Sequence, residues 1–236
     1  YSAYLARVNR SVFTPYTQRL IRAAAGLILR KPISIEGDPY WTDVFNKDVD
    51  GCGSDLDEYA RRLLICALTY GHCHTLVDFP APTDARSLAE ERALNRRPYW
   101  IEVDPTQIYG WRLDREANYG NLTQVRIGEK AVVPDGEFGE KVYDQIRVIE
   151  PGRYRVFRQE EQQKGMQGQF PYPSSFDQSD ATSEYELVES GPYSLDQIPL
   201  VTIYANKTDT MTSKPPLLDI AHLNLAHYQR QADLIH

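Results

Sequence analysis

The first part of the chain alternates apolar and polar residues at the spacing of a helix. Thr14 is a good capping residue, and Pro15 suits the first helical position because its missing N–H costs nothing there. Pro32 marks the end of this segment. The apolar positions predict a helix over residues 16–30: Leu20, Ala24, Leu27 and Ile28.

A second helical pattern follows a glycine-rich stretch. Ser54 can cap this helix, and acidic residues occupy its first turn, where the helix dipole favours negative charge. Gly71 is the expected left-handed stop. The predicted buried face consists of Leu56, Tyr59, Leu63, Cys66 or Ala67, and Tyr70. Beyond it we expect a short strand over residues 75–78 and a short charged helix over residues 84–95.

The period changes toward two in the middle of the chain. Strands are predicted over residues 100–103, 107–113, 122–127, 142–149 and 154–157, with turns at 118–121, 134–136 and 151–152. This succession favours an antiparallel meander. Residues 159–183 are rich in Gln, Ser, Gly and Pro, and we expect a mobile surface insertion there. Strands over residues 185–188 and 200–204 are predicted to close the β region.

The last segment predicts one long helix, which opens with Pro215 and Pro216. One face carries polar residues, namely Asp219, Asn224, Gln229, Arg230 and Asp233. The other face carries an apolar stripe at spacings of three and four, formed by Leu217, Ala221, Leu225, Tyr228, Ala232 and Ile235. We see no obvious cover for this stripe within the chain, so a neighbouring subunit is the expected partner.

These patterns together predict an α+β fold in three segments. Residues 1–98 form a mainly helical part, residues 99–213 a β-rich part, and residues 214–236 the start of a long helix. The chain begins without methionine and stops inside a helical pattern. We therefore expect it to belong to a longer polypeptide.

Composition narrows the possible classes of protein. The chain has 236 residues, of which 42% are hydrophobic, and no run is long and apolar enough to span a membrane. No N-terminal signal segment is visible. The formal net charge of -7 argues against tight binding of nucleic acid, which needs clustered Lys and Arg. Sixteen tyrosines lean toward subunit assembly, although many will be core residues.

The three cysteines, Cys52, Cys66 and Cys73, form no CxxC pair and suit a reducing compartment. His72-Cys73-His74 suggests a zinc site, with Cys52 or Cys66 as a further ligand. Neighbours on a strand point to opposite faces, however, so buried histidines with ordinary hydrogen bonds are the favoured interpretation. His222 and His227 are five positions apart, which is not the spacing that brings two imidazoles to one metal.

Two further patterns admit a functional interpretation. Gly51-Cys52-Gly53-Ser54 precedes a helix and could hold an anion, but a simple turn and cap is favoured because a phosphate loop needs a following Lys. Asp78, Glu102 and Asp104 lie at or near strand ends, where carboxylates could bind Mg²⁺. A metal-dependent phosphoryl or nucleotidyl transfer enzyme is therefore the alternative hypothesis. With no nucleophile motif, we expect no enzyme, no cofactor and no resident metal.

Several stretches occur in the order of one family pattern. The first stretch runs from Tyr4-Leu5-Ala6-Arg7 through Phe13 and Tyr16 to Arg30-Lys31-Pro32. The second runs from Val49-Asp50-Gly51 through Leu68-Thr69-Tyr70-Gly71 to Leu76-Val77-Asp78-Phe79-Pro80. The last two are Arg97-Pro98-Tyr99-Trp100 with Gln107-Ile108 and Trp111-Arg112, and the block from Pro215 to Tyr228 with Ala232-Asp233. In this order they resemble a branch of tailed-bacteriophage portal proteins.

The resemblance implies a structural subunit of the virion. Portal proteins form rings, typically dodecamers, at one capsid vertex, and double-stranded DNA passes through the ring during packaging and ejection. The implied partners are copies of the chain, the terminase large subunit, a head–tail adaptor, and the major capsid and scaffolding proteins; no membrane is involved. Residues up to about Ser213 would be the wing, and the helix from Pro215 the first stem helix. The clip, tunnel loop and crown would lie beyond His236.

Overall fold

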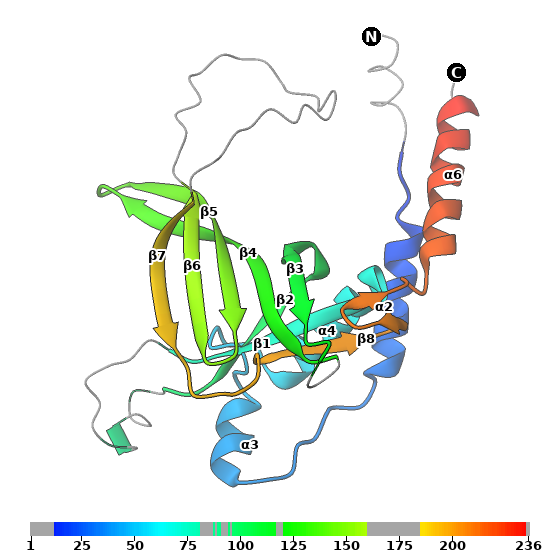
Figure 1. The fold of residues 1–236 in the computed structure, drawn as a ribbon. Helices are drawn as coiled ribbons and strands as arrows, with labels where there is room; N and C mark the ends of the chain where they lie inside the picture. Colours follow the sequence, from blue (N-terminus) through cyan, green and yellow to red (C-terminus); the bar gives the residue numbers. More distant parts are fainter. Residues whose placement is uncertain are drawn as a thin grey trace. The chain divides into compact units, whose positions relative to one another are not determined.

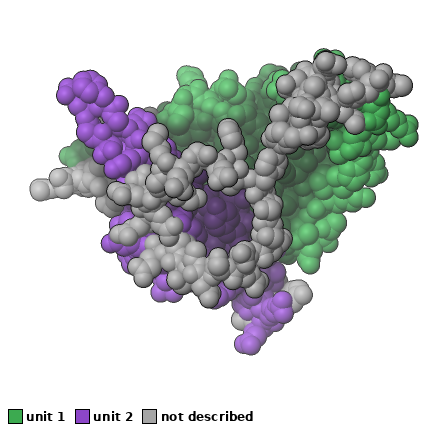
Figure 2. Space-filling view, turned by 90° about the horizontal axis from the view of Figure 1, so that it is seen from above, with its two compact units in different colours: residues 1–105, 199–236 green, residues 106–198 purple. Residues whose placement is uncertain are grey.

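The computed structural model describes residues 12–80, 87, 89–90, 94, 96–116, 120–159 and 185–234 (Figure 1). The chain divides into two compact units, one formed by Tyr1–Pro105 with Pro199–His236 and the other by Thr106–Ile198 (Figure 2). Helices and antiparallel strands both contribute, which confirms the predicted α+β class. The bounds of these units do not coincide with the three predicted segments, because the first unit combines strands from both ends of the chain.

Four described helices belong to the first unit: α2 (Tyr16–Ile28), α3 (Pro39–Phe45), α4 (Leu56–Tyr70) and α6 (Leu218–Leu234). Helix α2 begins at Tyr16, so Pro15 precedes the helix instead of opening it, and no side chain of its own segment caps it. The prediction that the Thr14 side chain is the cap is therefore wrong. The backbone N–H of Tyr16 donates to the Thr14 carbonyl and to Oδ1 of Asn224 on α6, both at 2.9 Å. A distant side chain thus fills the role of the local cap.

Helix α4 begins and ends almost as its sequence predicts. Its cap is Asp55 and not Ser54, because the Asp55 carboxylate accepts the Glu58 N–H at 2.8 Å. The helix ends at Gly71, which adopts a left-handed conformation with φ of 92°. A Cβ at this position would lie 2.8 Å from the carbonyl carbon of Lys214 and 2.9 Å from the nitrogen of Pro215. Both the conformation and the close approach therefore require glycine.

The sheet of the first unit has the strand order β2-β1-β8, and both pairs are antiparallel. Its strands are β1 (His72–Asp78), β2 (Tyr99–Val103) and β8 (Leu200–Tyr204). The prediction that β2 and β8 belong to one meander with the other strands is wrong. Strand β1 is longer than predicted and mostly buried, and it lies in the centre of the sheet, where β2 and β8 pair with its two edges. A short hairpin of β9 (Lys207–Asp209) and β10 (Thr212–Ser213) follows.

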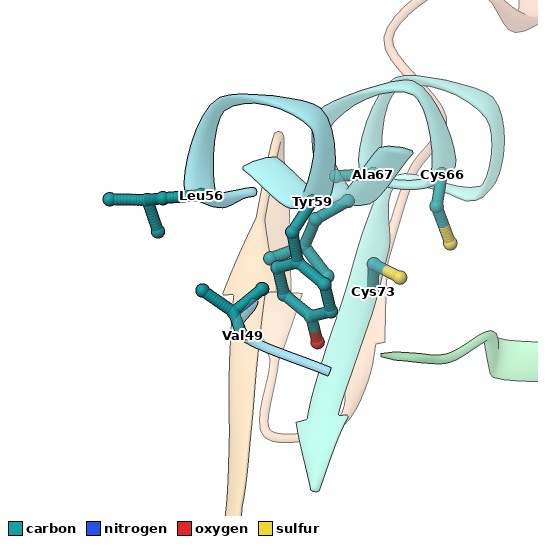
Figure 3. Packing of buried hydrophobic residues seen from close by; sticks show 7 residues of the cluster. Val49, Leu56, Tyr59, Cys66, Ala67 and Cys73 are labelled. Atoms are coloured by element: carbon teal, nitrogen blue, oxygen red, sulfur yellow. The ribbon is translucent and has the colours of Figure 1, made fainter. Parts of the chain in front are cut away.

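Helix α4 packs on this sheet and forms the core of the unit (Figure 3). The core cluster comprises Val49, Leu56, Tyr59, Leu63, Cys66, Ala67 and Cys73. This set includes most of the predicted face of the helix; Tyr70, the last predicted member, is 40% exposed. The Tyr59 hydroxyl lies 3.0 Å from the Thr75 hydroxyl, so the polar end of this buried ring is satisfied.

The second unit is an antiparallel meander of five strands in sequence order. The strands are β3 (Ile108–Leu113), β4 (Leu122–Asp135), β5 (Gly139–Glu150), β6 (Arg153–Gln159) and β7 (Tyr185–Pro192), and a short 3-10 turn (Pro105–Gln107) precedes them. Gly120, Gly136 and Gly152 have positive φ at the three predicted turns, which confirms the meander for this part of the chain. Strands β4 and β5 exceed their predicted lengths because they pair over eleven positions.

Several predictions lie wholly or mostly outside the described residues. These are the motif from Tyr4, the charged helix over residues 84–95, the insertion over residues 159–183, and Ile235 in the apolar stripe. Within the ranges that the structure describes, no helix has both the length and the apolar character needed to cross a bilayer.

Candidate subunit interface

Helix α6 packs against α2 and the segment before it, so its predicted polar and apolar faces need correction. Asn224, predicted on the polar face, is buried because it accepts the Tyr16 N–H. The Tyr228 ring packs edge-on against Phe13, with ring centroids 5.5 Å apart. His227 makes a similar contact with Tyr16 at 5.7 Å.

The predicted stripe on α6 is thus partly covered within its own chain. Ala232 is buried, and Leu217, Ala221 and Tyr228 are half-buried. Leu225 is the exception, since 51% of its surface is exposed. The prediction that the stripe has no cover within the chain is therefore wrong for Tyr228 and Ala232. The sequence pattern showed no sign of Phe13, whose ring comes from a segment more than two hundred positions earlier.

Helix α2 carries the larger exposed apolar surface. Its buried residues are Ile21 and Ala25, and α2 packs against α4. The positions that predicted the helix are mostly outward-facing, because Leu20 is 42%, Leu27 74% and Ile28 62% exposed. This helix therefore has two apolar faces, and the pattern alone does not tell which one is buried.

We define the outer helix surface as Tyr16, Leu20 and Leu27 on α2. These residues are spaced by four and seven positions and so lie on the same side of the helix. Val12 and Phe13 add exposed apolar residues before α2. Leu223 and Leu225 are also exposed on α6, but their spacing of two residues places them on opposite sides of that helix. Grouped exposed apolar side chains mark sites of protein association. The outer helix surface is the candidate interface of the first unit.

The glycine-rich turn before α4 does not offer a free anion site. The N–H groups of Cys52 and Ser54 donate to Asp50 Oδ1 at 2.9 and 3.1 Å, and that of Gly53 donates to Asp48 Oδ1 at 2.8 Å. These donors are therefore already bound to carboxylates of the chain itself. The anion-binding interpretation is wrong, and the favoured turn is confirmed.

Asp50 joins this turn to α4. Its Oδ2 lies 2.9 Å from the Arg62 guanidinium, which also bonds the Ser54 hydroxyl at 2.8 Å. Burial by itself raises the pKa of Asp50, but hydrogen bonds from Ser54, Arg62 and the Cys52 N–H outweigh it. The pKa of this carboxyl is held well below its ordinary value of 3.8.

A depression of about 320 Å³ lies beside the same turn, lined in part by Cys52, Arg97 and Tyr99. Arg97 is buried, and its guanidinium pairs with the Asp48 carboxylate at 2.7 Å and also bonds the Asp48 carbonyl. The positive charge of Arg97 is thus already matched. Among the described residues that line the depression, the other charged group is Asp50, which is already bound to Arg62.

The side chains of His72, Cys73 and His74 do not converge, as the favoured interpretation predicted. His72 Nδ1 lies 2.6 Å from the Ser213 hydroxyl, and His74 Nδ1 lies 2.9 Å from the Thr202 hydroxyl. Burial lowers the pKa of His74 to about 4, so this side chain is neutral near pH 7. Cys73 points to the other face of β1, toward α4 (Figure 3). A zinc site that joins Cys73 to His74 is therefore excluded by the geometry.

The three carboxylates of the enzyme hypothesis do not share one site either. In the antiparallel register Glu102 pairs with Thr75, whereas Asp78 pairs with Tyr99. Positions 75 and 78 of a strand point to opposite faces, so the side chains of Glu102 and Asp78 lie on opposite faces of the sheet. Glu102 and Asp104 are close enough to interact, since Asp104 raises the pKa of Glu102 after the larger effect of burial. Two of the three carboxylates, Glu102 and Asp104, therefore lie near each other, and Glu102 is paired with Arg62.

Comparisons with known proteins leave these sites without an assigned family. The sequence matches no family model and no curated protein. The resemblance to portal proteins therefore depends on the order of the motifs described above.

Proposed function

We propose that the chain is a structural subunit of a portal-like ring, which forms at one vertex of a viral capsid and lets double-stranded DNA pass. In this proposal the chain contributes the wing and, with α6, the start of the stem. The support is the ordered set of motifs, the α+β composition and the position of a helix after the double proline.

The observation that carries the proposal is the outer helix surface. Leu20 and Leu27 expose 42% and 74% of their surface, although side chains of this kind stabilise a fold only when they are removed from water. A subunit in a closed ring uses two different surfaces, one for each neighbour. We assign the outer helix surface to one of these contacts.

The net charge of the chain agrees with a ring through which DNA moves and not with a protein that binds DNA tightly. A net charge of -7 provides few sites that neutralise phosphates, and each phosphate contact would hold the DNA in place. The partners in this proposal are the terminase large subunit, a head–tail adaptor, the major capsid protein and a scaffolding protein. The location is the unique vertex of the virion.

Assembly of the chain tests the proposal directly. We expect a ring by negative-stain electron microscopy and a matching mass by light scattering. Replacing Leu20 and Leu27 together with Glu places two charges in the contact, and we expect assembly to weaken by at least about a hundredfold in concentration.

Leu195→Glu is the matched control, because Leu195 is also exposed, at 52%, but lies in the second unit outside the proposed contact. The control should assemble as the unmodified chain does. If the unmodified chain stays monomeric at every concentration and salt condition, or if Leu195→Glu and the double variant behave alike, the proposal is wrong.

The alternative, a metal-dependent phosphoryl or nucleotidyl transfer enzyme, receives no support from the positions of its residues. Asp78 lies on the opposite sheet face from Glu102, and Glu102 is already paired with Arg62 at 3.4 Å. Calorimetry with Mg²⁺ and Mn²⁺ tests the enzyme hypothesis. This hypothesis requires that the chain binds one of these ions and that Glu102→Gln and Asp104→Asn abolish the binding.

A further inference from the structure

Two cysteines and one carboxylate meet beneath α4, at a place that the proposed ring contact does not use and that shares only Glu102 with the enzyme hypothesis. Cys66 comes from the last turns of α4, Cys73 from the start of β1, and Glu102 from the middle of β2. One sulfur or oxygen atom of each residue lies within 4.8 Å of the other two. Figure 3 shows the two sulfur atoms beside the helix–strand contact, on the side where α4 faces β1.

The environment separates these groups from bulk water but leaves one side accessible. Cys73 is fully buried and Cys66 is 7% exposed. The side chain of Glu102 is 28% exposed. A small ion can therefore reach the sulfur atoms past Glu102, and the opposite side is closed by the core.

The donor atoms suit a thiophilic divalent cation. Zinc binds thiolate sulfur at about 2.3 Å and carboxylate oxygen at about 2.0–2.2 Å, in tetrahedral geometry. Tetrahedral ligands at these distances lie roughly 3.5–3.8 Å from one another. The three atoms need to approach by at most about one ångström from their present separations, which side-chain rotation can supply.

Charge balance also favours this cation. Two thiolates and one carboxylate carry three negative charges, and the cation supplies two positive charges. Arg62 lies beside Glu102, with Nε 3.4 Å from Oε2, and offsets part of the remaining negative charge, although it also pairs with Asp50 at 2.9 Å. The two thiol protons leave for solvent when the metal–sulfur bonds form, so no oxidant or reductant is needed.

From this geometry we propose that Cys66, Cys73 and Glu102 form a binding site for one zinc ion or a similar thiophilic divalent cation, with water as the fourth ligand. The site differs from the histidine-containing one considered from the sequence, because His74 faces the other side of β1. Its three protein ligands come from three elements. The ion therefore ties the end of α4 to both strands across the turn at Gly71 and stabilises the first unit.

The test uses the whole 236-residue chain, reduced and freed of metal, and titrates it with Cd²⁺ and then Zn²⁺. We expect one equivalent of Cd²⁺ to produce a thiolate-to-metal charge-transfer band in the ultraviolet, and Zn²⁺ to remove that band by displacement. We expect the melting temperature to rise by roughly 5–10 °C at a free zinc concentration about a hundred times Kd.

Variants identify the ligands. Cys66→Ser and Cys73→Ser should each lose the band, and Glu102→Gln should weaken binding by at least about tenfold. Cys52→Ser is the matched control, because Cys52 is exposed and lies outside the cluster. This control should bind as the unmodified chain does.

Cadmium NMR of the unmodified chain keeps the test decisive if a cysteine variant fails to fold, because the chemical shift reports the number of sulfur ligands. Two sulfur ligands with oxygen support the site. The proposal is overturned if no band and no rise in melting temperature appear, if Cys52→Ser abolishes binding, or if the shift reports no sulfur. None of these outcomes depends on whether the chain forms a ring.

Discussion

Single residues decide the local geometry before α4, and Asp50 is the clearest case. Its carboxylate accepts two backbone N–H groups and pairs with Arg62, so one side chain holds the turn and the helix together. Charge-assisted bonds of this kind are roughly twice as strong as those between neutral groups. The pKa of Asp50, lowered below 3.8, records that the folded state prefers the charged form.

We expect Asp50→Asn to lower the free energy of unfolding by about 2 kcal/mol at neutral pH, because Arg62 loses its partner. The pKa of Asp50 is lower in the folded state than in the unfolded state. The stabilisation is therefore fully present above pH 3.8 and is lost as the pH falls through the lower folded value. Urea unfolding of both proteins from neutral to acidic pH measures this, and the difference between them should shrink with acid.

Asp43→Asn is the control for this measurement, because Asp43 is an exposed carboxylate on α3. It should leave the free energy of unfolding unchanged within about 0.5 kcal/mol. A difference between wild type and Asp50→Asn that stays constant with acid would contradict the assigned role of the charge.

At the scale of elements, helix α2 depends on α6 for its first turn. The Tyr16 N–H donates to the Thr14 carbonyl and also to Asn224, which is 6% exposed and lies 208 positions away in the sequence. The apolar spacing predicts α2 over most of its length, but the local capping motif does not predict this bond, because the side chain that accepts it comes from another helix. The order of the first turn of α2 is thus linked to the docking of α6.

Asn224→Ala should cost about 1 kcal/mol of stability, the usual cost of a lost helix cap. Hydrogen exchange should show faster exchange in the first turn of α2, while α4, which does not contribute to this bond, stays protected. Gln229→Ala on the exposed side of α6 is the control and should change neither quantity. Unchanged exchange at Tyr16 and its neighbours in Asn224→Ala would disprove the cap.

At the scale of the whole molecule, the chain builds two separate cores. One lies beneath α4, and the other is formed on one face of the meander by Val125, Ile127, Ile149 and Val156. The second core uses a continuous stretch of chain, whereas the first gathers residues from both ends. Compact units with their own cores can unfold separately.

We expect Ile127→Ala, at a position only 1% exposed, to cost about 2–5 kcal/mol in the second unit. Hydrogen exchange in β3 to β7 should become faster, while α4 keeps its protection. Leu76→Ala, at 2% exposure in the sheet of the first unit, should give the opposite pattern. If both variants accelerate exchange equally everywhere, the chain unfolds as one unit.

The sequence by itself determined the elements whose signals are local. Helix α4 with its stop at Gly71, the strands of the meander and their glycine turns follow from spacing and from backbone freedom, so they could be predicted. The separation of Cys73 from His74 on opposite faces follows from the period of a strand in the same way. These features depend on neighbours along the chain.

The tertiary structure alone decided which apolar face is buried and which distant groups meet. Leu20 and Ile21 are both apolar neighbours, yet Ile21 is buried and Leu20 is 42% exposed. The pairing of β8 with β1, the bond between Asn224 and Tyr16, and the meeting of Cys66, Cys73 and Glu102 all join segments far apart in sequence. Hydrophobic burial is non-directional and depends only on the area removed from water, so periodicity can mark a face as apolar but cannot say what covers it.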